Sequence, residues 1–448
     1  MHNKFTISAC NPLQFSSTML DTVLESIIQT INPYSIIKHA CTIQENNFIV
    51  RDTSGNLHTY DISGYRDILL IGIGKACAPL ASYCIQLFGR DISKSLLVVK
   101  EGYQKELEGV SYIISGHPIP DKNSILAGEK ITDMVKDSDS DTLILFLITG
   151  GGSSLLELPK SGISLNDLCR FNKLLLHGGL SIQEINTLRT AISEIKGGKL
   201  GQIAYPATII SLILSDVPGN GIETIASGPT AVTKSNRPDA LDVINKYNLA
   251  AKTPENILKT LKQQSIKFSH KQKTRHIHNH LIGSNNIILE GLREIAENNN
   301  FFSKVVTDRL SGTIEKNIVM FEQILEKIPN NKVCLIAGGE SEVSVTSKYP
   351  AGGRNTHFAL VFAYEFYEKF TNRNIHFISF ATDGTDGKTD SAGAAVSMNH
   401  IRMNINRSEI AKHMKNFTSY NFFNEIGGLI KTGPTMSNFM DIQVLIAE

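Results

Sequence analysis

The sequence predicts an α/β protein with two domains, because short apolar runs typical of buried parallel strands alternate with segments of helical periodicity. The clearest run is LILFLI at 143–148. It shows no alternation of polar and apolar residues, as expected for a strand covered on both faces. At 448 residues the chain is also too long for one ordinary hydrophobic core. We therefore expect two α/β cores.

The first half of the chain begins with a helix at 21–31, where five apolar residues share one face and Asn32-Pro33 follows. A turn around 53–56 indicates a hairpin. Asp121 is placed to cap a second helix that runs to Val135. The predicted buried strands of this half are 68–71, 96–99, 143–148 and 209–214.

The second half repeats this pattern after a more polar stretch at about 231–280, which contains Pro238 and Pro254 and which we interpret as the boundary region. Two glycines at 352–353 open an apolar helix that extends to about Phe370. The predicted strands of this half are 333–336, 375–380 and 442–446.

Composition excludes several classes of protein. The net charge of +1 argues against a non-specific nucleic-acid surface, and no apolar run reaches the roughly 18 residues of a membrane span. The N-terminal residues do not resemble a signal peptide. The six cysteines are scattered with no C-x-x-C pair, which favours free thiols in a reducing compartment. We expect a cytoplasmic protein without a membrane or nucleic-acid partner.

The strand at 143–148 runs through Thr149 into Gly150, Gly151 and Gly152, followed by Ser153 and Ser154. Glycines allow bare backbone N–H groups to approach a ligand where a Cβ would collide. A helix beginning here would also favour an anion at its N-terminus. The stretch predicts a cradle for an anion, most simply a phosphate, and the alternative is a tight turn without a ligand.

The turn Gly72-Ile73-Gly74-Lys75 follows another predicted strand and invites a dinucleotide interpretation. The third position of the G-x-G-x-x-G/A pattern is Cys77, and the expected ribose-binding acid is absent. A lysine inside the turn suits a phosphate or carboxylate better. Phosphate binding is the preferred interpretation, with a nicotinamide cofactor and a plain turn as alternatives.

Several charged residues near strand ends or helix starts suit phosphoryl chemistry. Arg354 follows two glycines at the start of a helix, which suits bidentate anion binding; its alternative is a surface ion pair. Asp216, Asp383 and Asp386 lie beside glycines at predicted strand ends. A carboxylate there could bind Mg²⁺ or accept a hydroxyl proton, and the alternative is a helix cap or a turn.

The motifs, taken in order, resemble the glycerate 2-kinase family, whose members have two domains and a C-terminal MOFRL domain, and some of which are called hydroxypyruvate reductases. The match covers about residue 20 to the C-terminus. The motifs are GIGKA (72–76), HPIPD (117–121), TGGGSSLL (149–156), EIN with Arg189 (184–189), KGGKL (196–200), SDVPG (215–219), ASGPT (226–230), GGE (338–340), GGRN (352–355), TDGTDG (382–387) and TGPT (432–435).

The resemblance implies an N-terminal Rossmann-like three-layer domain with a parallel sheet at 1–240 and a C-terminal α/β domain with a mixed sheet at 241–448. The MOFRL region would cover about 333–446, and the N-terminal helix could pack on the second domain. The active site would lie in the cleft between the domains. The implied reaction is ATP-dependent phosphorylation of D-glycerate at its 2-hydroxyl, with Mg²⁺.

On this basis Lys75, Arg354 and Asp216 are the predicted catalytic residues, and Asp383 and Asp386 are candidate metal ligands. The predicted substrate- and nucleotide-binding residues are Gly74, Gly150, Gly151, Gly152, Ser153, Ser154, Asn186, Arg189, Lys196, Gly353 and Asn355. The oligomeric state stays open, with a homodimer as one option.

The chain departs from the usual family pattern at six positions, and these departures leave the exact acceptor open. They are Gly178, Leu180, Thr190, Ala191, Asn220 and His357. Two alternatives therefore stay beside the kinase: an NAD(P)H-dependent hydroxypyruvate reductase, and a weakly active homologue that binds metabolites.

Overall fold

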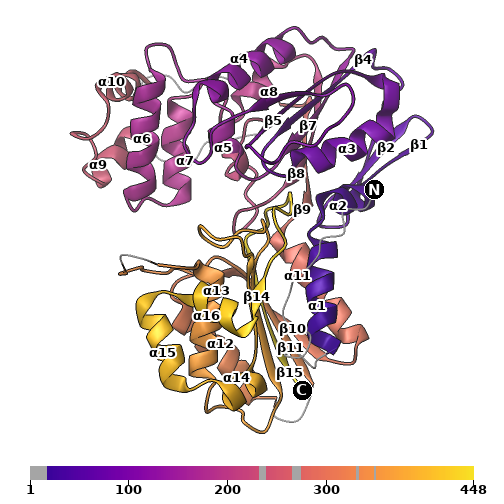
Figure 1. Cartoon of the computed structure of the whole chain (residues 1–448). Coiled ribbons are helices and arrows are strands. Elements are labelled where there is room, and N and C mark those ends of the chain that lie inside the picture. The colour runs from indigo at the N-terminus through magenta and orange to yellow at the C-terminus, as the bar shows by residue number, and fades with distance from the viewer. Residues whose placement is uncertain (1–17, 232–238, 265–273, 329–331, 348–349) are drawn as a thin grey trace. The chain divides into compact units, whose positions relative to one another are not determined.

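A computed structural model describes residues 18–231, 239–264, 274–328, 332–347 and 350–448 (Figure 1). The chain forms two compact units. Of the described residues, those within 18–35 and 284–448 form unit 1, and those within 36–283 form unit 2. The sequence analysis placed the boundary at 240/241, whereas in the structure unit 2 continues to Gly283.

Unit 2 is built on a six-stranded sheet in the order β6-β5-β4-β7-β8-β9, and every neighbouring pair is parallel. This is the doubly wound order, in which the winding direction reverses between β4 and β7. The four predicted strands are confirmed, and β6 and β9 are additions. The strands are β4 (Asp67–Ile73), β5 (Ile92–Val99), β6 (Ser111–Ile114), β7 (Thr142–Ile148), β8 (Thr208–Leu214) and β9 (Ile277–Gly283).

Helices lie on the sheet of unit 2. Apolar residues of α4 and α8 share one core with those of β4, β7 and β8, while α3 contacts β4, β5 and β7. Asp121 caps α4 as predicted, since its carboxylate accepts the Ser124 N–H. The bounds are α3 (Cys77–Phe88), η1 (Gly89–Asp91), α4 (Lys122–Lys136), α5 (Gly152–Leu155), α8 (Lys199–Ile203) and η2 (Ile225–Ser227).

A small antiparallel sheet, β1-β2-β3, contains the predicted hairpin at 53–56 between its second and third strands. It joins the main sheet because the Thr53 N–H donates to the Leu281 carbonyl of β9 at 2.8 Å. Helix α2 precedes it along the chain. The bounds are α2 (Pro33–Ala40), β1 (Cys41–Gln44), β2 (Asn47–Arg51) and β3 (Leu57–Asp61).

Four further helices of unit 2 share a separate apolar core that includes Phe171, Leu188, Val243 and Ile257. This packing explains the position of the boundary. After residue 240 the chain forms α9, which contacts α7, then α10, which contacts α9, and then β9, which pairs with β8. The helices are α6 (Leu165–His177), α7 (Ile182–Ala191), α9 (Ala240–Lys246) and α10 (Glu255–Gln264).

Unit 1 contains the predicted mixed sheet, in the order β10-β11-β15-β12-β13-β14. Strands β10 and β11 are parallel, and the other neighbours are antiparallel. One face packs on α12, α13 and the helices that follow. The strands are β10 (Phe302–Leu310), β11 (Val333–Gly339), β12 (Ile375–Ala381), β13 (Gly393–Ser397), β14 (Leu429–Ile430) and β15 (Asp441–Ala447).

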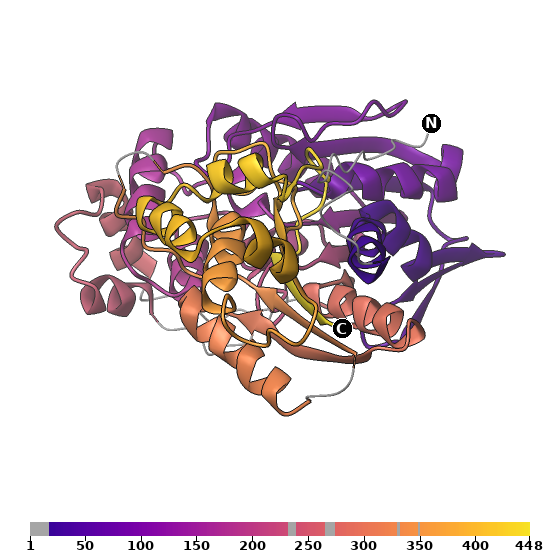
Figure 2. The same cartoon turned by 60° about the horizontal axis from the view of Figure 1, so that its bottom comes forward.

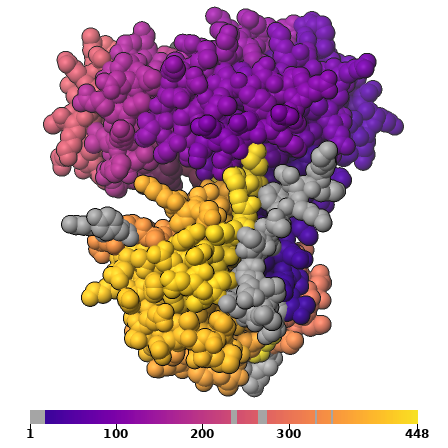
Figure 3. All heavy atoms as spheres, in the orientation of Figure 1, coloured from indigo at the N-terminus to yellow at the C-terminus, as the bar shows by residue number. Residues whose placement is uncertain are grey.

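Helix α1 belongs to unit 1 because it packs against α11, although the two are far apart in the sequence. Figures 1 and 2 show the two helices side by side, and Figure 3 shows indigo spheres of α1 beside salmon spheres of α11. The helices of unit 1 are α1 (Thr18–Thr30), α11 (Asn285–Asn298), α12 (Ile314–Glu326), α13 (Arg354–Glu365), α14 (Met398–Asn404), α15 (Arg407–Asn416) and α16 (Ser419–Ile426).

Among the described residues, no helix has both the length and the apolar character that a bilayer crossing needs. The five described cysteines are unpaired, and four of them are buried. Cys10 lies outside the described residues.

Candidate active site

Two loops meet where the winding of the unit 2 sheet reverses, one after β4 and one after β7. The Thr149 N–H donates to the Ile73 carbonyl at 2.9 Å, and the Lys75 N–H donates to the Gly150 carbonyl at 3.0 Å. Gly74 has a φ of +112°, and a Cβ at this position would collide with Thr149. Only glycine fits this approach, so the two loops hold each other at the carboxyl ends of the strands, where doubly wound sheets bind ligands.

Three side chains come close to the glycine loop. A Cβ added to Gly150 would collide with the Asp216 carboxylate, which comes from the loop after β8. A Cβ added to Gly151 would lie 3.2 Å from the His117 ring and 3.5 Å from the Lys75 side chain. The structure therefore brings a cation, an imidazole and a carboxylate to the loop where the sequence predicted an anion.

A hydroxyl network lies behind this loop. The Ser153 and Ser227 hydroxyls are 2.9 Å apart, and the Ser227 hydroxyl donates to Oδ1 of Asn186 at 2.8 Å. Ser227 and Ala226 have φ values of +59° and +51°. This left-handed conformation costs a non-glycine residue roughly 1–2 kcal/mol. Such strain persists only where surrounding contacts fix it, and it is concentrated at functional sites.

A buried ion pair supports the same loop. Nζ of Lys196 lies 2.6 Å from Oε1 of Glu157 and donates to the Ser153 carbonyl at 2.5 Å. The two side chains are only 2% and 3% exposed. Burial lowers the pKa of Lys196, and the Glu157 carboxylate opposes that shift. In this structure Lys196 positions the loop from within the protein, and its predicted contact with a substrate stays a prediction.

Asn186 and Arg189 lie on α7, three residues apart, and are 4% and 8% exposed. Nε of Arg189 donates to Oδ1 of Asn172 on α6 at 3.0 Å. Burial lowers the pKa of Arg189, while Glu157 raises it. Both predicted binding residues therefore reach the same region of unit 2 as the glycine loop and are largely covered by protein.

The second cluster belongs to unit 1 and is centred on Arg354, the first residue of α13. Its Nε lies 2.5 Å from Oδ2 of Asp441, and its Nη2 lies 3.1 Å from Oδ1 of Asp441 and 2.6 Å from Oε1 of Glu340. Asp441 pairs with the last residue of β11 and the last residue of β12, so these groups gather at one sheet edge. Burial raises the pKa of Asp441 to about 7, against the opposing effect of Arg354. Nη1 has no recorded partner among the described residues and stays available for an anion.

Asp386 caps α13. Its two oxygens accept the N–H groups of Gly353 at 3.1 Å, Asn355 at 2.9 Å and Thr356 at 2.8 Å. Burial raises the pKa of Asp386, and these hydrogen bonds lower it. Asp383 accepts the N–H of Thr385 at 3.1 Å. The metal-ligand role of the two aspartates stays a prediction.

Five residues of these clusters were not singled out from the sequence. His117, Ser227 and Glu340 stand within quoted motifs, and this was the available signal. Glu157 and Asp441 gave no local signal, because their partners Lys196 and Arg354 are distant in the sequence.

The parallel sheet of unit 2 and the mixed sheet of unit 1 define a two-domain α/β protein, whose glycine loop and arginine cluster are typical of sites for anionic groups. Two family models match the chain. A domain of unknown function, DUF4147, matches residues 19–262, and the MOFRL family matches residues 333–441.

Several relatives match most of the chain. A glycerate 2-kinase from Pyrococcus horikoshii is 33% identical over 94% of each chain. A relative from Agrobacterium vitis with hydroxypyruvate reductase in its name is 31% identical over 84% of this chain and 98% of its own. The crystal structure of a glycerate kinase from Thermotoga maritima has a TM-score of 0.81 at 29% identity and covers 96% of this chain and 99% of its own. The chain belongs to the glycerate 2-kinase family.

Proposed function

We propose that this protein is a glycerate 2-kinase, which transfers the γ-phosphoryl group of ATP to the 2-hydroxyl of D-glycerate. The family membership supports the reaction class. The observation that carries the proposal is the glycine loop, with Lys75, His117 and Asp216 gathered against it at the reversal point of the sheet. The scattered cysteines support a reducing compartment, and we place the reaction in the cytoplasm.

In this proposal the Lys75 ammonium and the backbone N–H groups of Gly150–Gly152 hold an anionic group, either the acceptor carboxylate or the transferring phosphoryl group. The 2-hydroxyl oxygen attacks the γ-phosphorus, a new O–P bond forms, and the bond from phosphorus to the leaving ADP oxygen breaks. The hydroxyl proton passes to the Asp216 carboxylate when that residue serves as the base. The products are 2-phospho-D-glycerate and ADP.

Arg354 stabilises the negative charge of the transferring group through Nη1. Asp441 and Glu340 hold the other guanidinium nitrogens, so the fork is oriented before a ligand arrives. A hydrogen bond to a charged group contributes about 1.5–3 kcal/mol, and a fixed donor at developing charge contributes more.

Magnesium enters such reactions with ATP, where it neutralises phosphate oxygens. Asp216 is the carboxylate that suits magnesium binding best. In that case it would bind the ion instead of serving as the base. Asp386 suits it less, because three backbone N–H groups already use its oxygens.

The strand order of unit 2 also suits a nicotinamide dinucleotide, which is the observation that favours a reductase. Against it, the third glycine of the turn is replaced by Cys77, whose buried thiol donates to the Gly74 carbonyl at 3.2 Å. The kinase is the better supported of the two.

Phosphorus NMR of the purified protein with Mg-ATP and a panel of 2-hydroxy acids tests the proposal. We expect a new phosphomonoester signal with D-glycerate, coupled to the proton on C2, and less product with L-glycerate. NADH consumption with hydroxypyruvate and no phosphoryl transfer would identify a reductase. Thermal stabilisation by ATP and glycerate without turnover would identify a metabolite-binding homologue.

A further inference from the structure

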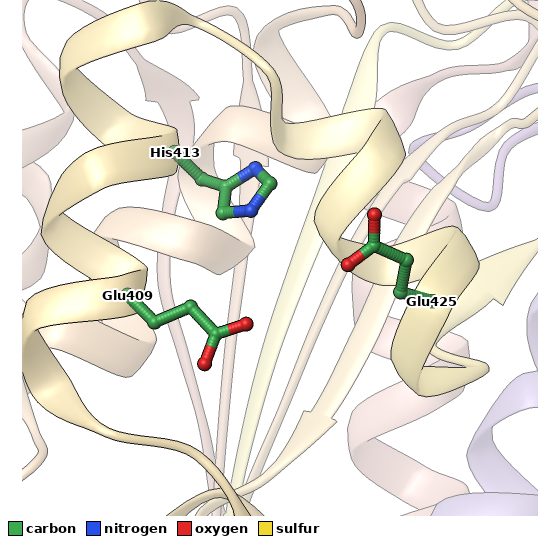
Figure 4. A group of neighbouring side chains, drawn as sticks. All are labelled: Glu409, His413 and Glu425. Atoms are coloured by element: carbon green, nitrogen blue, oxygen red, sulfur yellow. The ribbon is translucent and has the colours of Figure 1, made fainter.

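Helices α15 and α16 of unit 1 carry a group of three metal-ligand side chains that the proposed reaction does not use. Glu409 and His413 are one turn apart on α15, and Glu425 comes from α16 (Figure 4). Figure 4 shows the three side chains directed toward one another. One ligand atom from each lies within 4.8 Å of the other two.

The environment of the three residues favours a cation. No described residue is recorded as an ion-pair or hydrogen-bond partner of the Glu409 or Glu425 carboxylate, and both side chains are exposed. Two carboxylates this close repel each other unless a positive charge stands between them. The acids alone would be an ordinary surface feature. The imidazole between them adds a ligand that is typical of metal sites.

His413 is held in the orientation that metal binding requires. Its Nδ1 lies 2.8 Å from the Thr418 hydroxyl and 3.2 Å from the Thr418 carbonyl. A carbonyl only accepts, so the ring proton sits on Nδ1 and leaves Nε2 with a lone pair. Metal-binding histidines almost always donate their second N–H to a carbonyl or carboxylate in this way. The ring also packs against Phe422, with centroids 5.5 Å apart.

We propose that Glu409, His413 and Glu425 bind one divalent transition-metal ion of the Zn²⁺ class, with water as the fourth ligand. Zinc bonds to nitrogen and oxygen of about 2.0–2.1 Å place tetrahedral ligand atoms about 3.3 Å apart. The ligand atoms now lie within 4.8 Å of one another, and rotation of the two exposed glutamate side chains can bring them to the shorter zinc spacing. Mg²⁺ and Ca²⁺ prefer sites made only of oxygen, so the imidazole selects against them.

The ion would connect α15 to α16 across the turn at 417–418. This turn holds the chain just before the GGRN motif, since the Ala351 N–H donates to the Phe417 carbonyl at 2.8 Å and the Tyr420 N–H donates to the Ala351 carbonyl at 2.9 Å. Metal binding should therefore stabilise unit 1. Any effect on turnover through Arg354 rests on the proposed function, whereas binding and stability do not.

Calorimetric titration of ZnCl₂ into the metal-free, tag-free full chain tests the site. We expect one binding event that each of Glu409→Gln, His413→Asn and Glu425→Gln weakens by about tenfold or more. His400→Asn on α14 is the matched control and should bind as the wild type does. Zinc should raise the melting temperature of the wild type and of the control, but not of the three variants.

Melting of each variant without metal checks folding, and Glu409→Asp replaces the glutamine variant if that one fails to fold. Wild-type zinc affinity in all three variants would overturn the site. Weaker zinc binding in the histidine variant alone would also overturn it, because the proposed site needs both glutamates. Equal affinity for Mg²⁺ would overturn the assigned metal class. A kinase that lacks zinc binding, or a zinc-binding protein that lacks transfer, would separate this inference from the proposed function.

Discussion

Replacement of Lys196 by methionine should destabilise unit 2 by about 3–5 kcal/mol, because it leaves a buried carboxylate without its counter-ion. In the structure, Nζ of Lys196 lies 2.6 Å from Oε1 of Glu157, and the two side chains are 2% and 3% exposed. The change also removes the donor to the Ser153 carbonyl. The glycine loop would thus lose a support, and we expect turnover to fall as well.

The double variant Lys196→Met/Glu157→Leu distinguishes the cost of one unpaired buried charge from the net contribution of the ion pair. It removes both charges and should recover most of the lost stability, since desolvation of a buried pair roughly offsets its attraction.

Thermal unfolding followed by circular dichroism at 222 nm suits this chain, which has no tryptophan. A unit of this size shifts by about 2–4 °C per kcal/mol, so the single variant should melt at least about 6 °C below the wild type. A decrease in melting temperature of under about 2 °C would refute the reasoning that the buried Glu157 carboxylate needs the Lys196 ammonium as its counter-ion.

Acidification from about pH 6.5 to 4 should destabilise unit 1 by about 3 kcal/mol, because burial lowers the pKa of His376 to about 4 and unfolding then takes up a proton. His376→Leu should remove this part of the pH dependence in urea titrations, and an unchanged profile would contradict it. Asp386→Asn should lower the free energy of unfolding by about 1–2 kcal/mol, because an amide nitrogen replaces one of the two oxygens that accept N–H groups at the start of α13. The exposed Asp390→Asn should stay within about 1 kcal/mol of the wild type, and equal losses would argue against the cap. Ser227→Ala and Ser227→Gly should both lower kcat/KM, with the glycine variant about 1 kcal/mol more stable in urea because it tolerates the positive φ. An alanine variant as stable as the glycine variant would contradict that backbone geometry.

Strands with an unbroken apolar run could be predicted from the sequence, because burial on both faces requires such residues. All seven residues of β7 are buried, and its prediction was correct to within one residue. β9 was missed because it reads IHNHLIG. Its histidines contact a distant tyrosine: Nε2 of His280 lies 2.6 Å from the Tyr60 hydroxyl, and the His278 ring lies 5.0 Å from the Tyr60 ring. No local pattern indicates these contacts.

Some residues of the candidate site could likewise be predicted from the sequence, and others could not. Lys75 and the glycine loop could be found because both directly follow predicted strands, and parallel strands end at a common edge. The partner of Arg354 could not be found, since Asp441 lies 87 residues away and reaches it only through the order of the mixed sheet. Asp386 had two interpretations from sequence, and its cap became visible only with the backbone of α13 in place.

Steady-state kinetics of Lys75→Ala and Arg354→Ala with Mg-ATP and D-glycerate test the central claim most directly. Each variant removes a fixed cation, and the loss of one preorganised donor typically lowers turnover by about 10²–10³-fold. We predict a fall of this size in kcat for both variants. The melting temperature should stay close to that of the wild type for Lys75→Ala and should fall for Arg354→Ala, because the buried Asp441 carboxylate loses its counter-ion. The kcat values are therefore compared at a temperature below both unfolding transitions. Wild-type turnover in either variant would contradict the account.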